Sequence, residues 1–141
     1  MTEADRLIIA NLLSKSAAYS VLAAFFRRPE RVDEVWLSRG VDETPADFRD
    51  EFRMVRERVS GEGHLYSAVV GGTGVCPDGE IAHRPASPSG AILSDIAGFY
   101  HAFGYPLETG RDEKIDHVSV ELNFVSFLFA KETHARADGD V

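Results

Sequence analysis

Residues 115–131 constrain the fold of this chain more than any other stretch, because no other stretch is so densely apolar. At the 100° per residue of an α-helix their large apolar side chains point in every direction, which is typical of a helix covered on all sides. These side chains are Val118, Val120, Leu122, Phe124, Val125, Phe127, Leu128 and Phe129. The stretch contains no glycine or proline and runs on into polar residues at 131–136, so it is too long for a β-strand. It predicts a buried central helix.

Four polar residues interrupt this apolar stretch: Asp116, His117, Glu121 and Asn123. His117 and Glu121 are four residues apart, so they share one face of a helix. An isolated buried charge costs several kcal/mol, so Glu121 must either pair with a neighbouring group or face a groove. Asp116 suits the first turn, where the helix dipole favours a negative charge, and His117 or an arginine is a candidate partner for Glu121. The residues alone leave structural pairing and a functional groove both open.

Helical periodicity also predicts a long N-terminal helix over residues 3–27. Thr2 is followed three residues later by Asp5, a capping-box pattern at its start. The predicted core face consists of Leu7, Ile8, Leu12, Leu13, Ala17, Val21, Ala24 and Phe25. We therefore expect this helix to lie in the core.

Shorter helices are predicted over residues 31–38, before Gly40, and over residues 46–60, after Thr44 and Pro45. The second has a predicted buried stripe of Phe48, Phe52, Val55 and Val59. One or two helical turns over residues 64–70 and a helix that follows Ser89 or Gly90 and runs through Phe103, ended by Gly104 and Pro106, complete the set. The fold class is therefore all-α, a compact helical bundle in one domain over residues 1–141, with a long loop at about 71–90 and a polar tail at 132–141.

Composition restricts the partners and the compartment. Fifteen basic and 23 acidic residues give a net charge of −8, which disfavours nucleic acid and favours a cationic partner. A single cysteine, Cys76, excludes an internal disulfide and suits a reducing compartment. We find no run of about twenty apolar residues that would span a membrane, and the acidic N-terminus is unlike a signal peptide. The chain is expected in the cytoplasm, without stable membrane insertion.

No motif predicts a cofactor, a metal ion or an enzyme. The glycine-rich run at 71–74 lacks the G-K-[ST] ending of a phosphate-binding loop and has no clear strand before it. Cys76, His83 and His64 do not have the spacing of a zinc site. His117 and Glu121 can be read as an acid–base pair of a small hydrolase, but no nucleophile or cofactor motif accompanies them.

A more specific pattern covers residues 95–132. Phe99, Tyr100, Phe103 and Gly104 form F-Y-x-x-F-G, and after a short loop come Asp116, His117, Glu121, Leu122 and Phe124 as D-H-x-x-x-E-L-x-F. This order and spacing resemble the signature region of the TorD/DmsD/NarJ family, cytoplasmic chaperones that help molybdenum-containing oxidoreductases mature. Ile115 stands where the family usually has proline, which removes a helix-start signal but no recognition group.

A second match precedes it. Tyr66, Val69, Val70 and Gly71 lie where many members of this family have Y-x-x-L-F-x-G, and Pro77 and Glu80 continue the match. The two valines replace Leu-Phe, which would make an apolar floor at this place shallower. The resemblance thus extends into the long loop.

The resemblance implies a chaperone that binds the N-terminal twin-arginine signal peptide, or a related tail, of a molybdoenzyme catalytic subunit. Such a peptide carries an arginine pair followed by an apolar segment, so its binder needs carboxylates beside an apolar groove. The D-H pair of the family is associated with peptide binding, which assigns that role to Asp116 and His117. Glu121 is our own addition as a third charged group. The candidate groove consists of Tyr66, Val69, Val70, Pro77, Phe99 and Tyr100.

Two purely structural alternatives stay open. Phe99 and Tyr100 can simply be core aromatics, and the protein can be a structural helical subunit without a peptide groove. The surroundings of Asp116 discriminate, because a carboxylate that faces a cleft favours the chaperone and one sealed by salt bridges favours the structural subunit. If His117 lies between carboxylates, it also predicts pH-sensitive peptide release.

The C-terminal end departs from the family, whose members continue with further helices after the E-L-x-F helix. Here only about ten polar residues follow it. The resemblance therefore predicts a short form that lacks the last C-terminal helices, with an undercovered central helix. A second subunit can cover that helix in a homodimer or by domain swapping. The helix over 89–103 and the central helix are expected to lie antiparallel across the loop at 107–113.

Overall fold

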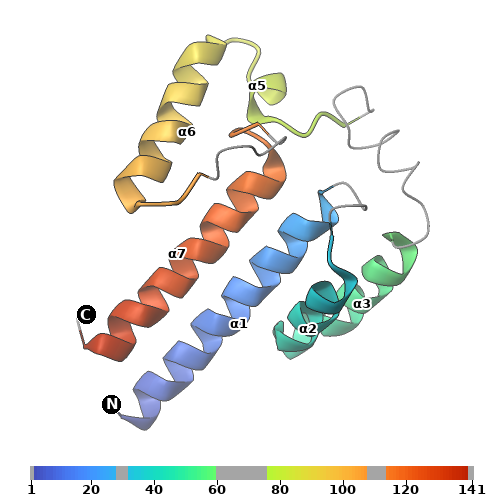
Figure 1. The fold of residues 1–141 in the computed structure, drawn as a ribbon, viewed down its shortest axis with the longest axis vertical. Coiled ribbons are helices and arrows are strands. Elements are labelled where there is room, and N and C mark those ends of the chain that lie inside the picture. Colours follow the sequence, from blue (N-terminus) through green and yellow to red (C-terminus); the bar gives the residue numbers. More distant parts are fainter. Residues whose placement is uncertain (1, 28–31, 60–75, 108–113, 140–141) are drawn as a thin grey trace.

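The computed structural model describes residues 2–27, 32–59, 76–107 and 114–139, and within these ranges the chain forms helices and no β-strand (Figure 1). The helices are α1 (Glu3–Phe25), α2 (Glu34–Glu43), α3 (Ala46–Val59), α5 (Glu80–His83), α6 (Ser89–Phe103) and α7 (Val118–Asp138). The all-α prediction is confirmed. The helical turns predicted over residues 64–70, with Tyr66, Val69 and Val70, lie outside the described residues, as does the glycine-rich run at 71–74.

The two long helices α1 and α7 lie side by side in opposite directions at the centre of the molecule (Figure 1). Two serines join them, since the Ser16 hydroxyl donates to the Ser126 carbonyl oxygen (3.0 Å) and the Ser126 hydroxyl to that of Ser16 (2.8 Å). Further along, Tyr19 packs against Phe129 with ring centroids 5.6 Å apart. Helix α7 continues to Asp138, so most of the predicted polar tail is helical.

Helix α1 starts where the sequence places it. The Asp5 backbone N–H donates to Thr2 Oγ1 (3.1 Å), and the Thr2 N–H donates to Asp5 Oδ2 (2.6 Å), which is the predicted capping box. By length and composition α1 is also apolar enough to cross a membrane, which the sequence analysis did not expect. Core helices and signal sequences meet the same criterion, so this property assigns no location.

A small core lies where α1 meets α2, and it contains Val21, Ala24, Leu37 and Val41. Gly40 does not end the helix as predicted but lies inside α2, which begins after the cap residue Asp33. A Cβ atom at Gly40 would lie 2.8 Å from Val21 Cγ2. This glycine therefore serves the close approach of two helices rather than a helix end.

Several apolar faces predicted to be buried are open to solvent. Helix α1 buries Leu12, Val21, Ala23 and Ala24 and exposes Leu7, Ile8 and Leu13. In α3 the predicted stripe is also wrong in part, because Phe48 and Val55 are exposed while Phe52 packs edge-to-face on Phe25. The large apolar side chains of α7 from Leu122 to Phe129 are only partly buried. Periodicity identifies an apolar face but not whether another element covers it.

The predicted antiparallel arrangement of α6 and α7 is wrong. Both helices run from the same end of the molecule in the same direction (Figure 1). Helix α6 ends at Gly104, whose φ of 68° is left-handed. Tyr105 packs on Phe124 and Phe127, and the Ile115 carbonyl accepts a hydrogen bond from the Tyr100 hydroxyl (3.1 Å). The start of α7 lies beside residues 78–80.

Candidate functional site

Residues 76–83 cross the start of α7 and hold it by backbone hydrogen bonds. The Val118 N–H donates to the Asp78 carbonyl (2.8 Å), and the Glu80 N–H donates to the Asp116 carbonyl (3.0 Å), around an isolated antiparallel bridge between Gly79 and His117. The Asp116 side chain adds a further bond, because its Oδ2 accepts from the Ile81 N–H (3.3 Å). The position of Asp116 and His117 is thus set by a segment about 35 residues earlier in the chain.

Gly79 permits this close approach, since a Cβ atom there would lie 2.7 Å from Asp116 Oδ2. We expect Gly79→Ala to lower the free energy of unfolding by about 1–3 kcal/mol, because the methyl group displaces the Asp116 carboxylate from Ile81. Urea unfolding measures this loss. Gly98→Ala in α6 is the control, because a Cβ atom there meets no other atom within 4 Å. An equal loss in both variants would contradict the steric explanation.

His117 is buried and uses both ring nitrogens. It is the N-cap of α7, since Nδ1 accepts from the Ser119 N–H (3.1 Å), and its Nε2 lies 3.2 Å from Asp78 Oδ2. The tautomer with the proton on Nε2 satisfies both contacts. Among the described residues His117 pairs with Asp78 and not with the Glu121 carboxylate, so the predicted acid–base pair is not formed.

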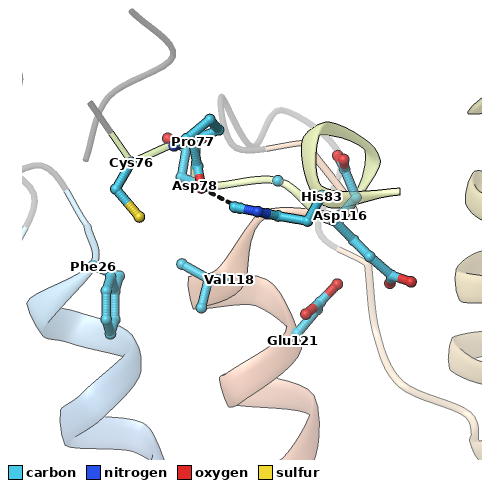
Figure 2. A pocket seen from close by; sticks show the side chains of 10 residues that line it. Phe26, Cys76, Pro77, Asp78, His83, Asp116, Val118 and Glu121 are labelled. Atoms are coloured by element: carbon cyan, nitrogen blue, oxygen red, sulfur yellow. Dashed lines mark hydrogen bonds between the residues drawn. The ribbon is translucent and has the colours of Figure 1, made fainter. Parts of the chain in front are cut away.

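A pocket of about 340 Å³ lies between residues 76–83, the end of α1 and the start of α7 (Figure 2). It is lined by Phe26, Cys76, Pro77, Asp78, Gly79, Glu80, His83, Asp116, Val118 and Glu121. The 76–83 segment and α7 with its preceding turn each contribute two of the four carboxyl groups, and Phe26 and Val118 form an apolar wall. Four residues with carboxyl groups thus surround a pocket whose exposed surface is mostly apolar.

Two carboxyl oxygens in this pocket have no hydrogen-bond partner although they are buried: Asp116 Oδ1 and Glu121 Oε1. The Asp116 residue as a whole is 3% exposed. A buried acceptor without a donor is uncommon in folded proteins and points to a hydrogen-bonding ligand. The arrangement can therefore take up a group that carries several donors and a positive charge.

Burial, together with the nearby negative charges of Glu80 and Asp116, raises the pKa of Glu121 to about 7. Burial also raises the pKa of the Tyr100 hydroxyl, with a smaller contribution from the charge of Glu121. Each cause penalises negative charge in this region. Shifted pKa values beside a pocket are a common property of functional sites.

The structure brings together some of the predicted site residues and separates others. Pro77, Asp116 and Glu121 line the pocket, and His117 holds the neighbouring turn in place. Tyr100 is buried behind the site, against Tyr105 and Phe124. Phe99 is 61% exposed, and neither Phe99 nor Tyr100 lines this pocket, so their predicted role in a peptide groove stays a prediction. Tyr66, Val69 and Val70 lie outside the described residues.

Seven lining residues were not among the predicted site residues: Phe26, Cys76, Asp78, Gly79, Glu80, His83 and Val118. Asp78 stands between Pro77 and Gly79, and an acidic residue in that setting was the available signal for a charged turn. Phe26 follows the last residue of α1, and nothing in its periodicity distinguishes it from core aromatics.

Among the described residues no group of three or more His, Cys, Asp and Glu side chains is placed to hold a metal ion. The pocket is therefore described by its carboxyl groups and its apolar wall. Comparison of the chain with protein-family models, with curated protein sequences and with solved structures gives no match, and the family resemblance of residues 95–132 stays a prediction.

Proposed function

We propose that this protein is a cytoplasmic chaperone that binds an N-terminal peptide of the twin-arginine type, or a related tail, on the catalytic subunit of a molybdenum-cofactor oxidoreductase. One observation carries the proposal: Asp116 and Glu121 line one pocket, and each has a buried carboxyl oxygen without a hydrogen-bond donor. A guanidinium group presents five N–H donors in a plane, which suits several carboxylates at once. The class of client enzyme comes from the resemblance of residues 95–132.

The size and the walls of the pocket support one arginine side chain as the occupant. A volume of about 340 Å³ is at the lower end of ligand pockets, too small for a folded partner. Phe26 and Val118 can cover the aliphatic stem of an arginine while its charged end reaches the carboxylates. The second arginine and the apolar segment of the peptide then lie outside this pocket.

Asp116 argues against a purely structural subunit. Its Oδ2 is bonded to the Ile81 N–H, which is a structural role, but Oδ1 has no partner and the residue lines the pocket. No salt bridge to Asp116 occurs among the described residues. One oxygen of this carboxylate therefore holds the turn, and the other has no hydrogen bond that would fix it in a purely structural role.

The net charge of −8 supports a cationic peptide rather than nucleic acid as the partner. The exposed apolar side chains of α1 and α3 support self-association, as a homodimer or by domain swapping. Sedimentation velocity over a range of protein concentrations tests this part separately from peptide binding.

The function is tested by titrating the protein with synthetic N-terminal peptides of molybdoenzyme subunits encoded nearby. We expect micromolar or tighter binding, and a loss of about 10- to 100-fold with Asp116→Asn, which keeps the shape and an acceptor for Ile81 but removes the charge. A peptide with lysines in place of both arginines should bind more weakly, because an ammonium group cannot form the bidentate contact.

Asp47→Asn, on the exposed surface of α3, makes the same change of charge away from the pocket and should leave peptide affinity unchanged. Circular dichroism shows whether each variant stays folded. A folded wild-type protein that binds none of the arginine peptides would overturn the proposed function. Equal peptide affinity in the wild type and in Asp116→Asn would show that Asp116 and its pocket do not take part in peptide binding.

A further inference from the structure

Two glutamates, Glu80 and Glu121, line the same pocket together with Asp116. Partial burial and these neighbouring carboxyl groups favour the protonated form of Glu121. Arg84 lies beside Glu80, with Nη1 2.6 Å from Glu80 Oε1. No such ion pair reaches Glu121 among the described residues, and its Oε1 is buried without a partner. The proton therefore belongs on Glu121.

We propose that the pocket exchanges a proton for a cationic side chain: the Glu80–Glu121 pair holds one proton when the pocket is empty and releases it when a guanidinium group binds. In this step the O–H bond of Glu121 breaks, the proton passes to the solvent, and the carboxylate accepts N–H donors of the ligand instead. The identity of the cation rests on the proposed function, but the proton in the empty pocket does not.

The other groups around Glu121 favour the same exchange. The 76–83 segment presents Asp78 and His83 besides Glu80, the turn before α7 presents Asp116 with His117 behind it, and α6 presents the Tyr100 hydroxyl. From α1 only the uncharged ring of Phe26 reaches the pocket. The acidic groups outnumber the histidines, so a second full negative charge on Glu121 is unfavourable until a cation enters.

This proton exchange at Glu121 is an alternative to the pH-sensitive peptide release through His117 that the sequence predicts. A proton on His117 Nδ1 would remove the acceptor that caps α7, whereas a proton on Glu121 disturbs no hydrogen bond within the described residues. A cation that binds only to the ionised glutamate competes with protons, so its affinity rises with pH up to the titration of Glu121 and is constant above it.

The first experiment follows the Glu121 side-chain carboxyl carbon by NMR during a pH titration of the free protein. We expect its midpoint well above that of Glu51, which is exposed on α3 and serves as the internal reference. A Glu121 midpoint equal to that of Glu51 would overturn the exchange whether or not any peptide binds.

The second experiment measures the affinity of an N-acetylated twin-arginine peptide for the full chain by calorimetry, in buffers of different ionisation enthalpy. Between pH 5 and 6.5 we expect the Kd to fall by about tenfold per pH unit, with on the order of one proton released. Above pH 8 both dependences should vanish. Glu121→Gln keeps every histidine and Glu80 but cannot release this proton, so its Kd should be independent of pH over the same range.

The outcomes separate the two proposals. Peptide binding with the same Kd from pH 5 to 8 in the wild type would overturn the exchange and leave the proposed function standing. An equal pH dependence in Glu121→Gln would assign the proton to another group and would also overturn it. If no arginine peptide binds at any pH, the proposed function fails, and the exchange fails with it.

Discussion

Val21→Ala is expected to lower the free energy of unfolding by about 2–3 kcal/mol, and addition of Gly40→Ala should return part of that loss. Val21 is fully buried between α1 and α2, so its truncation leaves a cavity. In the wild type Gly40→Ala should itself cost about 1–2 kcal/mol, because the new methyl group would lie 2.8 Å from Val21 Cγ2. In Val21→Ala the same methyl group enters the vacated space.

Urea unfolding of the four proteins in this double-mutant cycle measures the coupling, which we expect to be about 0.5–3 kcal/mol in favour of the pair. Val21→Ala combined with Gly98→Ala is the matched control and should be additive, since Gly98 has open space around it. Additive losses for Val21 and Gly40 would mean that α1 and α2 do not touch at these positions.

Glu121→Gln is expected to be more stable than the wild type at pH 8 by about 1–2 kcal/mol and equally stable near pH 4. Burial raises the pKa of Glu121 from 4.5 to about 7 in the folded protein. For a group whose folded pKa is raised, the stabilisation is fully present below the unfolded value, here below about 4.5. It is lost as the pH rises through 7. Glutamine resembles the protonated acid and never ionises, so it does not lose this contribution.

This pKa shift of Glu121 corresponds to at most about 3 kcal/mol of stability. Glu121 is partly exposed to solvent, so we expect the smaller difference of about 1–2 kcal/mol. The measurement is urea unfolding at pH 4, 6 and 8. Glu51→Gln on the exposed face of α3 controls for the loss of one negative charge and should show no such trend. Identical pH profiles for wild type and Glu121→Gln would show that this carboxyl group is solvated in the folded protein.

Local signals were sufficient to predict where α1 begins and where α6 ends, but not the bounds of α2 and α7 or the presence of α5. The capping box of Thr2 and Asp5 and the left-handed Gly104 act within a few residues, so they can be read without the fold. Gly40 also looked like a helix end, but its role is to allow the close contact between α2 and Val21. Its role depends on a helix about twenty residues earlier, which periodicity does not place.

The site was predictable only in part. A charge among apolar residues was enough to expect that Glu121 either pairs with a neighbouring group or faces a groove, because the cost of burying an isolated charge is general. The contribution of Asp78 depends on residues 76–83 crossing the start of α7, a tertiary contact without a local pattern. Phe99 and Tyr100 show the same limit: neighbours on one helix point about 100° apart, so one is buried and the other exposed.

The pairing of α1 with α7 also sets the order in which this protein can fold. The serines that join the two helices, Ser16 and Ser126, are 110 residues apart in the chain. Synthesis proceeds at about 5–20 residues per second from the N-terminus, so α1 waits several seconds on the ribosome before α7 exists. During that interval Tyr19, which packs on Phe129 of α7 in the folded protein, lacks this contact. Contacts of such long sequence separation form slowly, which makes the growing chain itself a candidate for protection by other folding factors.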